Sequence, residues 1–123
     1  MRTATLDIST SLFGEPAKPF LSARRVAELL GVNLSELAAL IGVARNTLAA
    51  KAGARKVDAA LSPVVRILAM AAEMAGDERR AAIWFKHQPI PGWAGKTAYD
   101  LVGEGKADKV LAYLEAVRSG VYA

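Results

Sequence analysis

Short stretches with helical apolar spacing, most of them closed by a glycine, make up the chain from Ser22 onwards. Glycine readily adopts the left-handed conformation in which helices end, so the pattern predicts successive helices. The 25 alanines favour the same result, because alanine is the best helix former. We therefore predict an all-α fold, an N-terminal helix-turn-helix followed by a small helical C-terminal domain. The predicted helices start near Ser22, Ser35, Arg45, Ser62–Pro63, Asp77, Thr97 and Lys106, and the glycines that end them are Gly31, Gly42, Gly53, Gly76, Gly103 and Gly120.

Charge and periodicity divide the 123 residues into three parts. Residues 1–21 have balanced charge, no sustained periodicity and two prolines, which predicts a mobile arm. Residues 22–56 carry six basic and two acidic side chains, whereas residues 57–123 carry eight of each. The whole net charge of +4 therefore lies in residues 22–56. It indicates either a polyanionic partner for that segment or a solvated basic surface with no partner.

Residues 34–53 have the spacing of a helix-turn-helix. The small Ala38 lets two helices approach closely, and Gly42, four residues later, suits the tight turn. Val43 and Leu48 are expected to pack the second helix onto the first. The alternative is an ordinary helical hairpin, which is common in alanine-rich chains. Spacing, glycine and charge together favour a DNA-binding element formed by residues 22–56.

In this motif the start of the second helix enters the major groove. Arg45 and Asn46 would then contact bases, while the two alanines that follow Leu48 offer only methyl groups. Ala44 stands where a capping serine or threonine is usual, which costs about 1 kcal/mol. Such sparse base contacts imply a dimer that reads two half-sites. The predicted DNA-contacting residues are Arg45, Asn46, Thr47, Ala50, Lys51, Arg55 and Lys56.

Residues 84–100 contain the only histidine and both tryptophans. His87 has no second histidine and no cysteine to accompany it, so it is best interpreted as a residue at the end of a helix, favoured there by the helix dipole. Trp84 and Phe85 are expected in the core. Trp93 lies in a glycine-bounded loop and is either a packing residue or an anchor for a partner. We predict no catalytic residue, metal site or cofactor.

Two acidic residues lie after this loop. We expect Asp100 to form a capping box with Thr97 at the start of the next helix, and we interpret Glu104 as a solvated charge. The chain has no cysteine, no secretory hydrophobic region in residues 1–21, and no apolar run longer than residues 67–72. These features predict a cytoplasmic protein with no membrane segment.

The order of these features resembles the Xre/MbcA/ParS antitoxin family, whose members join a helix-turn-helix to a toxin-binding C-terminal domain. The matching features are Leu61–Ser62 before a long helix, the helical Trp84, a proline-containing loop, Gly95-x-Thr97, and Gly105 followed by a last helix and a Gly120 tail. The resemblance covers residues 22–123. One departure is Ala98, where the family usually has a proline.

The resemblance implies a type II antitoxin whose protein partner is a RES-domain toxin that consumes NAD or uses it to ADP-ribosylate a target. It also implies that residues 57–123 bind the toxin, that the C-terminal tail obstructs the toxin's NAD pocket, and that the chain binds operator DNA, as a homodimer within a larger complex. The partner-binding residues carried over from the family, together with Trp93, are Gly95, Lys96, Thr97, Arg118, Gly120, Val121, Tyr122 and Ala123. Two alternatives remain from the residues themselves, a stand-alone repressor with a dimerising C-terminal half and a protein inhibitor with a purely structural helix-turn-helix. Of the functions considered, an enzymatic activity is the least favoured by the sequence.

Overall fold

The computed structural model describes residues 22–49 and 53–120, and the described part is helical apart from turns and one isolated β-bridge. The all-α prediction is therefore confirmed. The N-terminal half holds α2 (Ala23–Leu30), α3 (Leu34–Ile41) and α4 (Arg45–Ala49). The long α5 (Ala54–Ala75) leads to α6 (Glu78–His87), α7 (Ala98–Gly103) and α8 (Ala107–Arg118).

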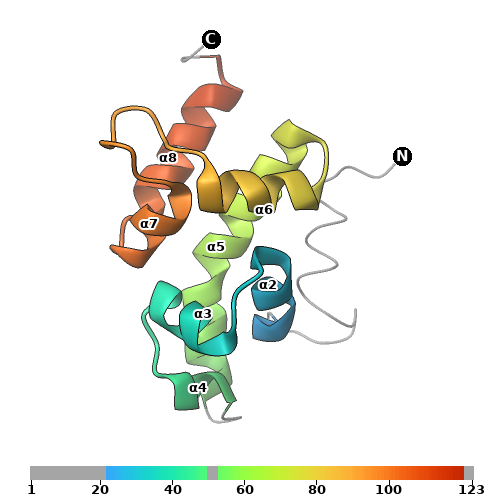
Figure 1. The fold of residues 1–123 in the computed structure, drawn as a ribbon, viewed down its shortest axis with the longest axis vertical. Coiled ribbons are helices and arrows are strands. Elements are labelled where there is room, and N and C mark those ends of the chain that lie inside the picture. Colours follow the sequence, from blue (N-terminus) through green and yellow to red (C-terminus); the bar gives the residue numbers. More distant parts are fainter. Residues whose placement is uncertain (1–21, 50–52, 121–123) are drawn as a thin grey trace.

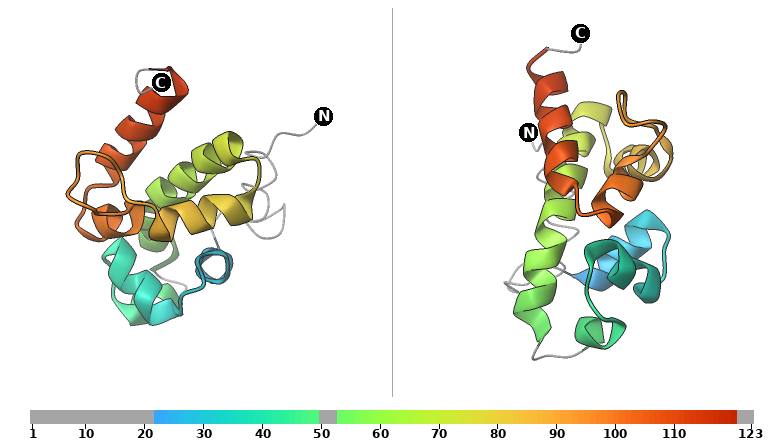
Figure 2. Two further views of the ribbon diagram at one scale, coloured as in Figure 1. Left: turned by 45° about the horizontal axis from the view of Figure 1, so that its top comes forward. Right: turned by 90° about the vertical axis from the view of Figure 1, so that its left-hand side faces the viewer.

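The helix α5 forms the axis of the molecule (Figure 1). Its 22 residues extend about 33 Å at 1.5 Å per residue. The helices α2, α3 and α4 lie beside its N-terminal part, whereas α6 and α8 pack against its C-terminal part (Figure 2). Two further contacts, α2 with α6 and α3 with α7, join the halves directly. The boundary between the two predicted functional segments, residues 22–56 and 57–123, lies inside α5, so the two segments share this helix.

The buried side chains form one apolar cluster that includes residues from both halves. It extends from Val26 on α2 to Leu114 on α8, and its largest fully buried member is Phe85 on α6. Phe85 meets Tyr99 of α7 edge to face, with ring centroids 6.1 Å apart. Trp84, expected in the core beside Phe85, is only partly buried against it. A single core of this kind couples the stability of the N-terminal helices to that of the C-terminal helices.

The predicted helix caps fall into two groups. Ser22, Asp77 and Thr97 cap helices as expected, with their side chains accepting hydrogen bonds from backbone N–H groups three residues on. The predicted cap at Ser35 is wrong, because α3 begins at Leu34 and is capped by Asn33. Asn33 forms a reciprocal capping box with Glu36, which satisfies two backbone donors at once. The Ser35 hydroxyl has no acidic residue three positions later with which to do the same.

The predicted start of the long helix at Ser62–Pro63 is also wrong. The helix begins at Ala54, and Pro63 lies inside it. An internal proline removes one helical hydrogen bond and costs about 3 kcal/mol. The helix continues because Leu61 and Val64, on either side of Pro63, are both fully buried in the core. Tertiary packing outweighs the local signal here.

No single helix within residues 22–49 and 53–120 is long and apolar enough to cross a membrane. Only α5 and α6 taken together reach the necessary length and composition, and they are bent by 114° at the break between them.

Candidate DNA-binding and partner-binding sites

The turn between α3 and α4 has the geometry that the helix-turn-helix spacing predicts. Gly42 adopts a left-handed conformation with φ of +76°, and its N–H points back to the last carbonyls of α3. The N–H of Val43 donates to the carbonyl of Ala38 at 3.0 Å, which closes the turn. Ala38 is buried, and Leu48 of α4 packs against the core. Ala38, Gly42 and Leu48 therefore occupy the positions predicted for them, whereas Val43, also predicted to pack the two helices together, is half-buried and does not belong to the core cluster.

The predicted base-contacting residues, Arg45 and Asn46, are exposed at the first turn of α4. Arg55 and Lys56 are exposed in the first turn of α5, which packs against α4. The structure thus places four of the predicted polar groups on two adjacent helix ends at one end of the molecule (Figure 1). Ala50 and Lys51, also predicted to contact DNA, lie outside the described residues.

Thr47 differs from its predicted neighbours because it is half-buried. It faces Gly53, the residue before α5, so closely that a Cβ on Gly53 would lie 2.7 Å from the Thr47 Cγ2 and 2.9 Å from its carbonyl oxygen. Both distances are shorter than real carbon contacts, so Gly53 is required for α4 and α5 to approach this closely. Sequence reasoning assigned Gly53 only to ending a helix.

A second candidate site is the loop between α6 and α7, residues 88–97, with the α7–α8 turn beside it. A β-bridge pairs Pro89 with Thr97 at its base, and the buried Ile90 anchors it in the core. Its backbone is closed by three hydrogen bonds, from the N–H groups of Ile90, Trp93 and Lys96 to the carbonyls of Lys96, Ile90 and Trp93. Four predicted partner-binding residues, Trp93, Gly95, Lys96 and Thr97, therefore belong to one compact loop.

Side-chain contacts hold this loop against the turn between α7 and α8. The Lys96 Nζ lies 2.9 Å from Oε1 and 2.8 Å from Oε2 of Glu104, and the Lys106 Nζ lies 3.3 Å from Oε1. Lys106 also sits over the half-buried Trp93, 5.5 Å from the ring centroid, within the range of a cation–π contact. The hydrogen bond from Lys96 is the main reason that the pKa of Glu104 is lowered. Glu104 is exposed, in agreement with its interpretation as a solvated charge, but it also binds two lysines, which the sequence did not indicate.

The tail residues predicted to bind a partner are separate from this loop. Arg118 is the last residue of α8 and pairs with Glu115. Gly120 follows in a left-handed conformation with φ of +86°, and its N–H donates to the carbonyl of Val117 at 3.0 Å. Lys106 and Arg118 lie at opposite ends of α8, about 18 Å apart for 12 residues. Val121, Tyr122 and Ala123 lie outside the described residues.

Among the residues that the structure describes, no carboxylate or second histidine lines the depression beside His87. His87 is exposed at the last position of α6, as predicted, and lines a shallow depression with Arg80, Ile83, Trp84 and Gln88. Within the described ranges, no three histidine, cysteine, aspartate or glutamate side chains come together in a way that could hold a metal ion.

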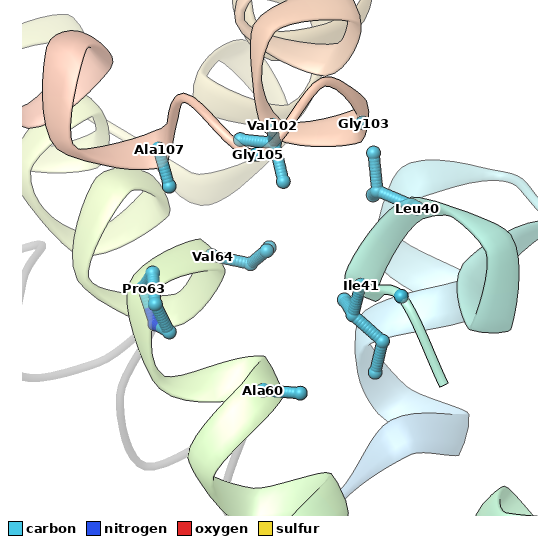
Figure 3. A pocket seen from close by; sticks show the side chains of 10 residues that line it. Leu40, Ile41, Ala60, Pro63, Val64, Val102, Gly103, Gly105 and Ala107 are labelled. Carbon is cyan, nitrogen blue, oxygen red and sulfur yellow. The ribbon is translucent and has the colours of Figure 1, made fainter. Parts of the chain in front are cut away.

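An apolar hollow of about 300 Å³ lies where the N-terminal and C-terminal halves meet (Figure 3). Leu40 and Ile41 at the end of α3 face Pro63 and Val64 of α5 across it, and the α7–α8 turn closes one side. Small residues create the space, and they are Gly42, Ala60, Gly103, Gly105 and Ala107. No polar side chain lines it, so the hollow offers packing space between the halves and no catalytic groups.

Tyr99 of α7 and Glu36 of α3 lie near each other, a proximity that the sequence did not indicate. Burial, and in second place the negative charge of Glu36, raises the pKa of the Tyr99 hydroxyl. The two residues line one depression with Leu40, Asp100 and Gly103. They are 63 positions apart in the sequence, so no local spacing rule connects them.

Comparison with known proteins finds a family for each half of the fold. The antitoxin Xre-like helix-turn-helix domain matches residues 15–65, which include α2, α3 and α4 and the first half of α5. The antitoxin Xre/MbcA/ParS C-terminal toxin-binding domain matches residues 70–120, which include α6, α7 and α8. No curated protein and no solved structure matches the chain.

Proposed function

The chain belongs to the Xre/MbcA/ParS antitoxin family, and from this premise we propose that it is a type II antitoxin that neutralises a RES-domain toxin and binds operator DNA. One observation carries the proposal. Both domains of such antitoxins match in the expected order, the DNA-binding type on the N-terminal helices and the toxin-binding type on the C-terminal helices. The partner in toxin neutralisation is a protein, and the chain itself catalyses no reaction in this account.

The loop and the tail of the C-terminal half supply the proposed contacts with the toxin. Trp93 is half-exposed in the loop, and a large aromatic side chain of this kind is a frequent anchor of protein interfaces. Its neighbours Lys96 and Thr97 lie on the same loop. The tail after Gly120 is proposed to enter and obstruct the NAD pocket of the toxin. The RES identity of the toxin and its use of NAD come from the family resemblance.

The exposed ends of α4 and α5 supply the proposed contacts with DNA. Arg45, Asn46, Arg55 and Lys56 are all exposed, and the proposal assigns the first two to base edges and the last two to phosphates. Two base-reading side chains give little sequence specificity, so we propose that a homodimer reads two half-sites about 34 Å apart. A dimer with about six phosphate contacts would lose roughly 10³-fold in affinity between 50 and 200 mM salt.

Paired substitutions test the two activities separately. Trp93→Ala is expected to weaken toxin binding at least 30-fold, the effect of losing an interface hot spot, and to leave DNA binding unchanged. Arg45→Ala is expected to abolish operator binding and leave toxin binding unchanged. The matched control for Arg45 is Arg66→Ala, since Arg66 is exposed on α5 and lies outside the proposed DNA surface.

The measurements are co-purification with the RES-domain protein encoded beside this chain and gel-shift titration of the promoter DNA at 150 mM salt. An adjacent reading frame of another type, or failure to co-purify, would contradict the toxin assignment. If Arg45→Ala binds the promoter as well as Arg66→Ala does, the helix-turn-helix is structural and the DNA assignment is wrong.

A further inference from the structure

The loop between α6 and α7 contains the only non-glycine residue with positive φ within residues 22–49 and 53–120. Ala94 has φ of +54°, between Gly92 and Gly95, which have φ of +87° and +83°. The left-handed conformation costs an L-residue with a Cβ roughly 1–2 kcal/mol. Strained residues persist only where the surroundings fix them, and they concentrate at functional sites.

The base of the loop is fixed by the bridge between Pro89 and Thr97 and by the burial of Ile90. Beyond the base, Pro91, Gly92, Ala94 and Gly95 are exposed, while the half-buried Trp93 ring packs against the core and two backbone hydrogen bonds close the loop on itself. Two polar side-chain contacts also connect the loop to the turn between α7 and α8. One is the ion pair of Lys96 with Glu104, and the other is the Lys106 ammonium over the Trp93 ring.

Glu104 is common to both contacts, because its carboxylate also binds Lys106. Its own position is fixed, since it follows α7 directly and its backbone N–H donates to the carbonyls of Asp100 and Leu101, each at 3.1 Å. The next two residues are held as well, with the N–H of Lys106 donating to the carbonyl of Leu101 at 2.8 Å. A rigid turn therefore presents one carboxylate to two lysines, one in the loop and one beside Trp93.

We propose that Glu104 is a positioning residue that holds the Trp93 loop in the conformation that docks on the toxin. The inference rests on the proposed function of the loop, but it concerns a residue that does not itself belong to the predicted interface. Without the carboxylate, Lys96 and Lys106 are two close like charges, and they repel each other. Lys106 then leaves the Trp93 ring, and the loop loses one of the contacts that offset the strain at Ala94.

The expected effect is moderate, because the side chains of Lys96, Lys106 and Glu104 are 42%, 43% and 35% exposed. Exposed ion pairs stabilise weakly in isolation, and only networks with shared partners contribute more. We expect Glu104→Gln to increase the rate of dissociation from the toxin about five-fold. Glu104→Asp keeps the charge and is expected to retain most of the wild-type affinity. Glu28→Gln, at an exposed glutamate on α2, is the matched control and should change nothing.

The loop itself is observed by fluorine NMR on the full chain labelled with 5-fluorotryptophan, without toxin. Two signals are expected, from Trp84 and Trp93, and Trp93→Phe assigns them. Glu104→Gln should shift the Trp93 signal and increase its solvent exposure, and Glu104→Asp should restore it. The Trp84 signal should stay in place, since Trp84 packs on the core and reports that the chain is folded. Acidification should shift the wild-type Trp93 signal with a midpoint below the ordinary glutamate pKa of about 4.3, and should leave that of Glu104→Gln unmoved.

The two readouts separate this inference from the proposed function. If the wild-type chain fails to bind the toxin, the proposed function fails while the fluorine signal still tests whether Glu104 holds the loop. The inference is overturned if Glu104→Gln leaves the Trp93 signal where it is in the wild type. It is equally overturned if the signal shifts but toxin dissociation is unchanged, because the position of the loop then has no bearing on docking.

Discussion

Replacing Phe85 with alanine tests whether the two functional halves form one cooperative unit. Phe85 is fully buried on α6, in the C-terminal half, and contacts the ring of Tyr99. Removing a buried phenylalanine side chain costs about 3–5 kcal/mol, partly for the lost transfer free energy and partly for the cavity. About 1 kcal/mol lowers the melting temperature of a domain of this size by 4–8 °C, so Phe85→Ala should lower it by roughly 20 °C.

The loss in free energy of unfolding should extend to both halves of the molecule. Since one apolar cluster runs from Val26 to Leu114, the helices α2 and α3 should lose as much stability as α8 does. Native-state hydrogen exchange measures this directly, because protected amides in the helices report the free energy of unfolding for each part. Calorimetry should show a single transition before and after the change.

The control is Ile83→Ala, on the same helix two positions earlier. Ile83 is 55% exposed, so its removal should cost less than about 0.5 kcal/mol. The account is refuted if Phe85→Ala reduces protection in α6, α7 and α8 while α2 and α3 keep theirs. That result would mean that the halves fold as independent domains and that the shared α5 does not couple them.

Three further predictions concern single positions. Gly53→Ala should destabilise the chain by about 1–3 kcal/mol and weaken promoter binding, because the new Cβ meets Thr47; thermal melts and gel shifts measure the two effects. Ala94→Gly should raise the melting temperature slightly, because the relief of strain exceeds the entropy gained by the unfolded chain. The free energy of unfolding should depend on pH through two groups. The lowered pKa of Glu104 stabilises the fold above the ordinary glutamate pKa, and this contribution is lost as pH falls through the lowered pKa. The raised pKa of Tyr99 stabilises the fold at lower pH, and this contribution is lost as pH rises above about 10. Melting curves against pH should lose the acid part in Glu104→Gln and the alkaline part in Tyr99→Phe.

Helix ends were predictable wherever the deciding interaction is local. Ser22, Asp77 and Thr97 each cap a helix through a hydrogen bond to the third residue along the chain. The error at Ser35 was avoidable on the same grounds, because Asn33 has Glu36 three positions later and Ser35 has Ala38. The spacing of acidic residues after a candidate cap therefore decides between neighbouring candidates.

Features that depend on tertiary packing were not predictable in this way. Pro63 signals a helix start by local rules, but burial of Leu61 and Val64 carries α5 through it. Glu104 binds Lys96 eight positions earlier, across the whole of α7, so the three- and four-residue spacing of ion pairs on a helix does not reveal it. The close approach of Gly53 to Thr47 likewise depends on how α5 crosses α4.

The candidate sites also contain residues of both kinds, some that motif spacing indicates and some whose contacts depend on tertiary packing. The residue types at the start of α4 and in the Trp93 loop follow from motif spacing, so Arg45, Asn46 and Trp93 could be selected from the sequence. What holds these residues in place comes from residues distant in the chain or in another helix. The contacts of Arg45, Asn46 and Trp93 with DNA or a partner stay predictions, whereas the structure shows the contacts of Gly53 and Glu104, which the sequence did not indicate.

The measurement that tests the central claim most directly is NAD consumption by the purified RES-domain toxin in the presence of this chain. The account predicts that the full chain stops NAD consumption at stoichiometric concentration, and that a chain lacking residues 119–123 binds the toxin but leaves NAD consumption largely restored. Complete inhibition by the shortened chain would show that the tail does not obstruct the NAD pocket. Undiminished NAD consumption with the full chain bound or in excess would contradict the assignment as the antitoxin of a RES-domain toxin.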